Sequence, residues 1–185
     1  MAKLLQQKIK IIRDDAYKNA VQSLFRDHPA MVRTSPKAVR VFQAGVYPVR
    51  RKYTGRWKFP KHFFPLIADM DSDEEVECAL AIEANKSVHT WVRNIALEPQ
   101  ASFWLQTATD RFYPDFVVKL TDGRILVVEY KGAGWLGNPD TDEKTILGRV
   151  WAERSGNLFL LATKKDDAGR DLTAQINRVV TTAQN

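Results

Sequence analysis

Hydrophobic and polar residues recur along the chain with two periods, and the order of those periods predicts a mixed α/β fold. Apolar residues three or four apart predict helices over Leu4–Phe25, from Ser72 to about Glu83, Asp142–Ser155 and Asp171–Ala183. Short apolar, β-branched runs predict strands over Ser87–Leu97, Ala101–Ala108, Phe112–Leu120, Arg124–Lys131 and Asn157–Thr163. The order helix, three or four strands, helix, strand, helix indicates a central mixed sheet with helices on both faces.

The best-defined local feature is a hairpin near the middle of the chain. Asp122-Gly123 between two β-branched runs is a strong signal for a tight turn. With that turn, Asp115 lies opposite the region of Glu129. Glu129 and Lys131, two residues apart on a strand, point to the same face. Two carboxylates and a lysine are therefore expected to converge at one end of the hairpin.

This trio predicts a site for a hard cation. Mg²⁺ prefers oxygen ligands and keeps several waters, so Asp115 and Glu129 with a substrate phosphate would satisfy it, and Mn²⁺ is expected to substitute. Lys131 would orient the attacking water. The alternative is an ordinary surface Glu–Lys pair worth less than about 1 kcal/mol. The apolar neighbours on both strands favour a buried hairpin, where a carboxylate and a lysine are costly without a function.

Composition narrows the class of protein. A length of 185 residues suggests one domain, with or without an appended arm, and 44% apolar residues exclude a wholly disordered chain. The single cysteine, Cys78, gives no disulfide framework, so a reducing, cytoplasmic location is expected. The three histidines lack the spacing of a zinc site. No apolar stretch is long enough for a signal peptide or a membrane span, so no membrane partner is expected.

Charge divides the chain into two parts. Residues 1–60 hold 14 Lys/Arg and 3 Asp/Glu, whereas residues 61–185 hold 14 and 19. We therefore predict a basic extension over residues 1–65, made of the first helix and a strand-rich, aromatic arm, and a catalytic core over residues 66–185. The arm's expected nucleic-acid contacts are Arg50, Arg51, Lys52, Arg56 and Lys58. The alternatives are that the basic face is only solvated and that the aromatic residues only fill a core.

Three stretches carry a resemblance to a known superfamily. They are residues 72–94 (SDEEVECALAIEANKSVHTWVRN), 112–132 (FYPDFVVKLTDGRILVVEYKG) and 138–155 (NPDTDEKTILGRVWAERS). With Pro114-Asp115 and Glu129-Tyr130-Lys131, they resemble the PD-(D/E)xK nucleases, the restriction-endonuclease-like superfamily. Within it the chain is most similar to the C-terminal nuclease domain of type III restriction enzyme helicase subunits. The resemblance implies a restriction-endonuclease-like core of order α-β-β-β-α-β and a Mg²⁺-dependent DNA endonuclease, with Asp115 and Glu129 as metal ligands and Lys131 at the attacking water.

The resemblance also directs attention to three further residues. It implies an active-site glutamate on the helix from Ser72, and Glu75 fits by position and by helical face, although it could instead only cap its own helix. Glu83 is a weaker rival. A polar residue on the helix over 142–155 would support the site, which suggests Lys144, unless that side chain only lies along the helix surface. Arg93 would contact a phosphate or form a salt bridge at the edge of the core.

The resemblance implies partners as well as chemistry. DNA is the expected substrate, in a restriction or phage-defence system. No GxxxxGK[ST] phosphate loop is present, so an ATPase or helicase motor would belong to another chain, alongside a methyltransferase, or to a longer parent. A homodimer stays open. The alternatives to an enzyme are a nuclease-like module that binds DNA or RNA, and an interaction domain that is active only with such a partner.

Overall fold

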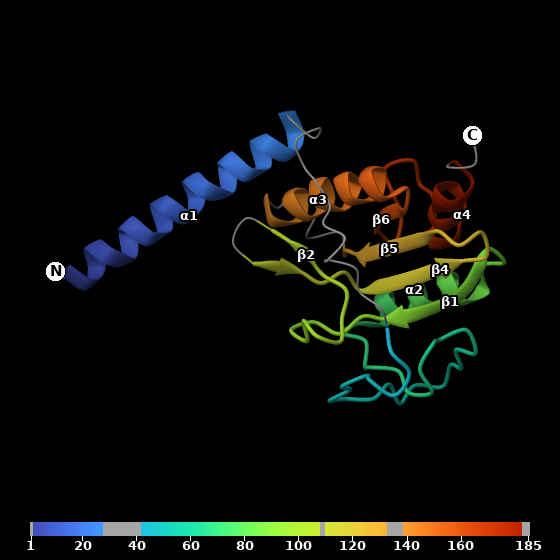
Figure 1. Cartoon of the computed structure of the whole chain (residues 1–185). Helices are drawn as coiled ribbons and strands as arrows, with labels where there is room; N and C mark the ends of the chain where they lie inside the picture. The colour runs from blue at the N-terminus through green and yellow to red at the C-terminus, as the bar shows by residue number, and fades with distance from the viewer. Residues whose placement is uncertain (1, 28–41, 108–109, 133–138, 183–185) are drawn as a thin grey trace.

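The computed structural model describes residues 2–27, 42–107, 110–132 and 139–182, and these form four helices and two sheets (Figure 1). The helices are α1 (Ala2–Asp27), α2 (Asp73–Ala84), α3 (Pro139–Ser155) and α4 (Leu172–Thr182). The strands are β1 (Val88–Arg93), β2 (Leu105–Gln106), β3 (Arg111–Phe112), β4 (Phe116–Leu120), β5 (Ile125–Tyr130) and β6 (Leu158–Ala162). All four predicted helices are confirmed, with ends that differ by up to three residues.

The main sheet is mixed and has the strand order β1-β4-β5-β6. β1 and β5 both pair antiparallel with β4, and β6 pairs parallel with β5 after the α3 crossover. The hairpin that joins β4 and β5 turns at Gly123, whose φ of +92° favours glycine. Asp122 Oδ1 accepts the Arg124 N–H at 2.9 Å and fixes the turn. The predicted hairpin, its register and its central place in the sheet are therefore confirmed.

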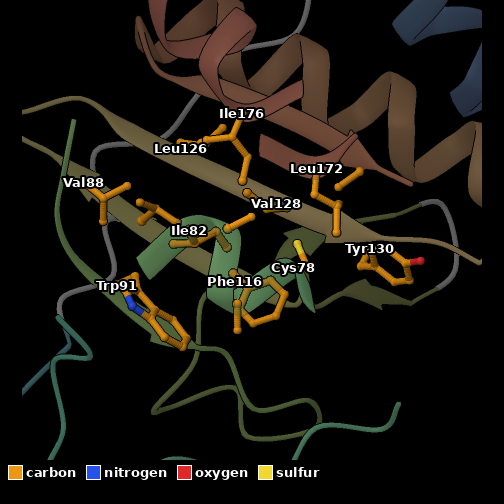
Figure 2. Close-up of a cluster of buried hydrophobic side chains, with 14 of the residues drawn as sticks. Cys78, Ile82, Val88, Trp91, Phe116, Leu126, Val128, Tyr130, Leu172 and Ile176 are labelled. Atoms are coloured by element: carbon orange, nitrogen blue, oxygen red, sulfur yellow. The ribbon is translucent and has the colours of Figure 1, made fainter. Parts of the chain in front are cut away.

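The core fills the space between one face of the sheet and the helices α2 and α4 (Figure 2). Alternate residues of β4 and β5 supply the sheet side, and Cys78 and Ile82 of α2 pack against them with no exposed surface. Leu172 and Ile176 of α4 complete the layer. The strict alternation follows from the two-residue period of a strand, and it leaves the intervening residues of β4 and β5 for the opposite face.

Helix α3 covers that opposite face. In β6, Leu158 and Leu160 pack against the core cluster, so Phe159 between them points the other way. A Cβ on Gly148 of α3 would overlap the Phe159 ring, which shows how closely the helix approaches the strand. The prediction of helices on both faces of a mixed sheet is therefore confirmed.

Three strand predictions were wrong in extent. The strand expected over Ser87–Leu97 ends at Arg93. The run expected over Phe112–Leu120 is broken at residues 113–115, because Pro114 lacks an N–H to continue the ladder. Its first part, β3, pairs with β2 in a separate two-stranded sheet, and β2 is only two residues of the strand expected over Ala101–Ala108.

The basic arm also differs from its prediction. The strand-rich segment expected over residues 41–64 is irregular where it is described, and its only ladder contacts there are isolated bridges at Lys52 and His62. Three prolines in and next to it (Pro48, Pro60 and Pro65) remove backbone donors. The division at residue 65 stays a prediction, but Phe59 before it and Met70 after it share one core cluster.

One helix is far longer than the others. α1 spans 26 residues, covers the helix predicted over Leu4–Phe25, and contacts α3. No helix within the described ranges is both long and apolar enough to cross a bilayer.

We expect Gly148→Ala to lower the free energy of unfolding by about 1–2 kcal/mol. The added methyl group overlaps the Phe159 ring, and overpacking in the upper part of the usual range, about 2–3 kcal/mol, outweighs a gain in helix propensity of about 1 kcal/mol. Urea unfolding of the two proteins measures the difference. Arg149→Ala, an exposed neighbour on the same helix, is the control and should stay within about 0.5 kcal/mol. A Gly148→Ala protein as stable as the control would show that α3 does not need this close approach.

Candidate active site

Asp115 lies at the break that interrupts the predicted strand. The register that pairs Phe116 with Val128 brings it to the end of β5. There Asp115 Oδ2 accepts the backbone N–H of Tyr130 at 2.8 Å. A side chain thus replaces the ladder bond that the chain gives up at Pro114, and the carboxylate is held beside Glu129, as the sequence predicts.

Glu129 and Lys131 form a close ion pair on β5. Lys131 Nζ lies 2.6 Å from Glu129 Oε1, which confirms that the two side chains share a face. Glu129 is 4% exposed, and its other oxygen, Oε2, is buried with no hydrogen-bond partner among the described residues. Burial, followed by the nearby Asp115 charge, raises the pKa of Glu129 to about 8 against the attraction of Lys131. An unpaired buried carboxylate oxygen is costly unless a ligand binds it.

Arg93, the last residue of β1, joins three carboxylates. Its guanidinium lies 2.9 Å from Glu75 Oε2, 3.2 Å from Asp115 Oδ1 and 3.5 Å from Asp71 Oδ2. The side chain is only 8% exposed. Of the two roles expected for Arg93, the structure shows the salt bridge at the edge of the core, and the nucleic-acid contact stays a prediction.

Glu75 comes to this cluster because of how α2 begins. Ser72 caps the helix by accepting the Glu75 N–H at 3.2 Å, as the sequence predicts. The Glu75 carboxylate turns towards Arg93 and also accepts the Asp71 N–H at 3.2 Å. Its contribution therefore extends beyond capping, and its burial agrees with the helical face expected for it. Glu83 lies elsewhere, where it accepts the Trp91 indole N–H at 2.7 Å.

Asn94, the residue after β1, stabilises the break between β3 and β4. Its Nδ2 donates to the carbonyls of Phe103 and Pro114 at 2.8 and 2.9 Å, and its Oδ1 accepts the Phe103 N–H at 3.0 Å. Its own N–H donates to the Asp115 carbonyl at 2.8 Å. This buried amide satisfies backbone groups that the broken ladder leaves open. No sequence pattern predicts this function of Asn94.

His62 and Tyr47 support the backbone of Arg93 from the irregular arm. His62 Nε2 accepts the Arg93 N–H at 3.1 Å, so Nδ1 carries the proton and donates to the Phe64 carbonyl at 2.9 Å. Tyr47 Oη donates to the Arg93 carbonyl at 2.6 Å. Sequence reasoning missed both residues, because they act on backbone atoms and have no motif spacing.

Lys144 lies near the trio without touching it. It forms an ion pair with Asp140 at 2.7 Å, one turn earlier on α3, and is 24% exposed. Its charge is close enough to lower the pKa of Glu129, although burial dominates. The partly buried position agrees with the face predicted for Lys144, and a supporting role is left as a prediction.

The predicted nucleic-acid residues of the arm are all exposed. Arg50 pairs with Glu98 at 3.0 Å, and Arg51 lies 3.9 Å from Asp71. Lys52 and Lys58 extend into solvent, and Arg56 stacks over the Trp57 ring at 4.6 Å. A shallow pocket of about 160 Å³ separates the arm from the loop after β1, and its lining is Arg50, Arg51, Ala68, Asp69, Ile95, Ala96 and Leu97.

Asp115 and Glu129 are the direct candidates for metal ligands among the described residues of this site. Over the ranges that the structure describes, no three His, Cys, Asp or Glu side chains gather closely enough to hold a metal ion. Asp115 and Glu129 remain a pair, and the unpartnered Glu129 Oε2 is the oxygen best placed to accept a ligand. Such a pair fits Mg²⁺, which takes one or two carboxylates and completes its shell with water and phosphate oxygens.

We expect Arg93→Met to destabilise the protein by about 3–5 kcal/mol, because it leaves the Glu75 and Asp115 carboxylates partly buried without a counter-charge. Urea unfolding measures the loss. The same change combined with Glu75→Leu should recover part of it, since an apolar pair removes one stranded charge. Arg51→Met, at an exposed arginine beside the same Asp71, is the control and should have little effect. A loss below about 1 kcal/mol for Arg93→Met would contradict a central role for this ion cluster.

We expect His62 to lower stability as the pH drops below about 6.5, while the raised pKa of Glu129 acts in the opposite direction. Burial lowers the pKa of His62, so the unfolded chain takes up a proton first and gains stability relative to the folded one. Protonation would also place a hydrogen between His62 Nε2 and the Arg93 N–H. Lowering the pH from 7.5 to 5.5 should change the free energy of unfolding less unfavourably for His62→Gln than for the original protein. His89→Gln, at an exposed histidine, should keep the slope. Equal slopes in all three proteins would remove His62 from the acid response.

No family model, no curated protein and no solved structure matches the chain. A function is therefore inferred from the geometry of Asp115, Glu129 and Lys131 together with the resemblance of their motif.

Proposed function

We propose that this chain is a Mg²⁺-dependent endonuclease domain of the PD-(D/E)xK type that hydrolyses phosphodiester bonds in DNA. The observation that carries the proposal is the meeting of Asp115 with the Glu129–Lys131 ion pair, where a buried glutamate oxygen has no partner. A carboxylate pair with an adjacent lysine is a typical arrangement for metal-assisted phosphoryl chemistry.

The order of the elements around the site supports this proposal. Without the small β2–β3 sheet, the chain reads α2, β1, β4, β5, α3, β6. That is the α-β-β-β-α-β order that the resemblance implies for a restriction-endonuclease-like core. The trio lies where the central strands β4 and β5 begin and end, and Glu75 reaches it from α2 through Arg93. Fold alone does not fix function, so the proposal depends on the side chains.

Asp115 and Glu129 would hold the Mg²⁺ ion. When bound, it would supply charge neutralisation at the phosphate and a water of lowered pKa. Arg93 holds Asp115 in place through Oδ1, and the Tyr130 N–H holds it through Oδ2. Both contacts leave each oxygen a further lone pair for a ligand. The protein's main contribution here is to fix the direction of the carboxylates before the substrate arrives.

Lys131 would act as a charged hydrogen-bond donor. Burial lowers the pKa of Lys131, but the charge and hydrogen bond of Glu129, together with the charges of Asp115 and Asp140, raise it overall, so the ammonium group keeps its proton. It therefore does not suit the part of a base that accepts the proton of the attacking water. Instead Nζ would orient that water or a phosphate oxygen and offset charge that develops as the water oxygen attacks phosphorus and the P–O bond breaks.

The exposed cations of the arm would bind the DNA backbone. Arg50, Arg51 and Lys52 lie on the segment that leads towards Asp71, which shares Arg93 with the candidate site. Contacts of this kind give affinity that weakens with salt and carry no sequence information. The setting that we propose, following the resemblance, is a cytoplasmic restriction or phage-defence system in which a helicase or methyltransferase partner supplies the remaining activities.

One observation favours a second candidate, a nuclease-like module that binds DNA or RNA without cutting. Asp115 already accepts hydrogen bonds on both oxygens, and Lys131 is paired with Glu129. These contacts could be the whole purpose of the cluster, because buried charges are retained in some proteins for structure alone. The two candidates differ in whether a divalent cation makes the protein cleave its ligand.

Nicking of supercoiled plasmid DNA tests the proposal. With Mg²⁺ or Mn²⁺ the protein should convert supercoiled to open circles, and EDTA should stop it. Asp115→Asn and Lys131→Ala should each reduce the rate by at least about 10²-fold, since each removes a preorganised charge from the reacting phosphate. Both variants should still bind DNA in a gel-shift assay with Ca²⁺.

Matched controls lie at the other end of the same hairpin. Asp122→Asn and Lys119→Ala make the same chemical changes at exposed positions and should leave the rate unchanged. If the unmutated protein binds DNA but never nicks it with either metal, the binding module is the better description. If it does neither alone but nicks when a helicase or methyltransferase partner is added, the function belongs to an assembly.

A further inference from the structure

Helix α1 leaves a row of aliphatic side chains in solvent. Leu5, Ile9 and Ile12 are 59%, 57% and 68% exposed, although residues of this kind are usually buried. Figure 1 shows the N-terminal part of α1 extending well away from the α/β body. The helix contacts α3, but that contact leaves this apolar row uncovered. An uncovered row of this length on a helix indicates an interaction surface.

The spacing of the row is that of a coiled coil. Leu5, Ile9, Ile12 and Ala16 follow one another at intervals of four, three and four residues. These intervals place Ile9 and Ala16 at the first core position of a heptad, and Leu5 and Ile12 at the second. This seam is suited to packing against one other helix, and the equally exposed Leu4 and Ile11 lie outside it on another side of α1.

The charges beside the seam favour one of the two possible orientations of a pair of α1 helices. Lys8 and Asp15 occupy the flanking position before each first core residue, and Arg13 lies on the other flank. In a parallel pair of α1 helices, Lys8 of one copy would face Arg13 of the other, and the like charges would repel. In an antiparallel pair, Lys8 faces Asp15 of the second copy, and symmetry repeats the attraction.

We propose that α1 packs antiparallel against α1 of a second copy of this chain and makes a two-fold homodimer. In this register Ile9 packs on Ile12 of the second copy, and Leu5 packs on Ala16. The same register thus satisfies the apolar layers and the two Lys8–Asp15 pairs. The assembly goes beyond the proposed nuclease and does not depend on it. If both hold, the dimer carries two candidate sites, which is what a double-strand break needs.

The mass of the full-length protein in solution is the first test. Light scattering during gel filtration should give twice the 21.1 kDa chain mass. Ile9→Asp combined with Ile12→Asp should give the single-chain mass, because a carboxylate cannot be buried in the seam without a partner. Ile11→Asp, at a residue of the same helix that is 60% exposed but outside the seam, should stay dimeric. Circular dichroism would show that all three proteins are folded.

Charge exchange tests the flanking pairs. Lys8→Glu and Asp15→Lys should each raise the dimer dissociation constant by about 3- to 10-fold, and the two changes together in one chain should restore it. Equal weakening by the single and double variants would contradict the antiparallel register.

Disulfide trapping gives the orientation directly. Cys78 has no exposed surface and does not compete for cross-linking. When Leu5→Cys chains are mixed with Ala16→Cys chains, oxidation should give a cross-linked pair that contains one of each. Ala16→Cys alone should cross-link poorly, because that pairing needs parallel helices.

Three outcomes would overturn the proposal: a single-chain mass at every concentration, a dimer that survives Ile9→Asp with Ile12→Asp, or efficient cross-linking of Ala16→Cys alone. Capture of the single chain by anionic vesicles would assign the row to a membrane surface instead. None of these readouts uses DNA cleavage. A dimer that never nicks DNA therefore leaves this proposal standing and removes the nuclease, and a monomer that nicks DNA does the reverse.

Discussion

The ion cluster around Arg93 is the interaction on which the organisation of the site depends. One buried guanidinium ties the end of β1 to the start of α2 through Glu75 and to the broken strand through Asp115. A guanidinium taken out of water is very costly, and the carboxylates taken out with it compensate only when the geometry is good. The backbone of Arg93 is itself fixed by His62 and Tyr47. The direction of the Asp115 carboxylate is therefore set by contacts from several parts of the chain.

Asp115 lies between Arg93 and Glu129, and its negative charge has opposite effects on the two sides. On one side Arg93 stabilises its ionised form, and on the other the ionised Asp115 makes it harder for Glu129 to lose a proton. Arg93 removes part of this conflict, but Glu129 keeps a raised pKa and an unpartnered oxygen. A cluster with a purely structural role gains no stability from a buried glutamate at position 129, because a neutral glutamine there would be easier to bury. The remaining strain is what a bound cation would relieve, because it lets both carboxylates ionise together.

The sequence predicted the parts of the structure that follow from local periodicity. The Asp-Gly turn fixes the β4–β5 register, and that register alone brings Asp115 to Glu129 and Lys131. The helical face of Glu75 was predictable in the same way. The break at Pro114 was readable in principle from the missing N–H, but its repair by Asn94 was not, because that amide acts on backbone groups distant in sequence. The irregular arm carries no period, so the support that His62 gives to Arg93 has no signal in the chain.

Burial separates two uses of arginine within one small region. Arg50 and Arg51 pair with acidic residues while 81% and 75% of their side chains stay exposed, so a phosphate can replace those carboxylates at little cost. Arg93 meets the same Asp71 that lies near Arg51, but it is enclosed, and no mobile ligand can displace its partners cheaply. Asp71 thus lies between an exchangeable cation and a fixed one. A polyanion that binds Arg51 would leave Asp71 paired with Arg93 alone. The Asp71 carboxylate is therefore shared by the arm that would bind the polyanion and by the arginine that positions Asp115.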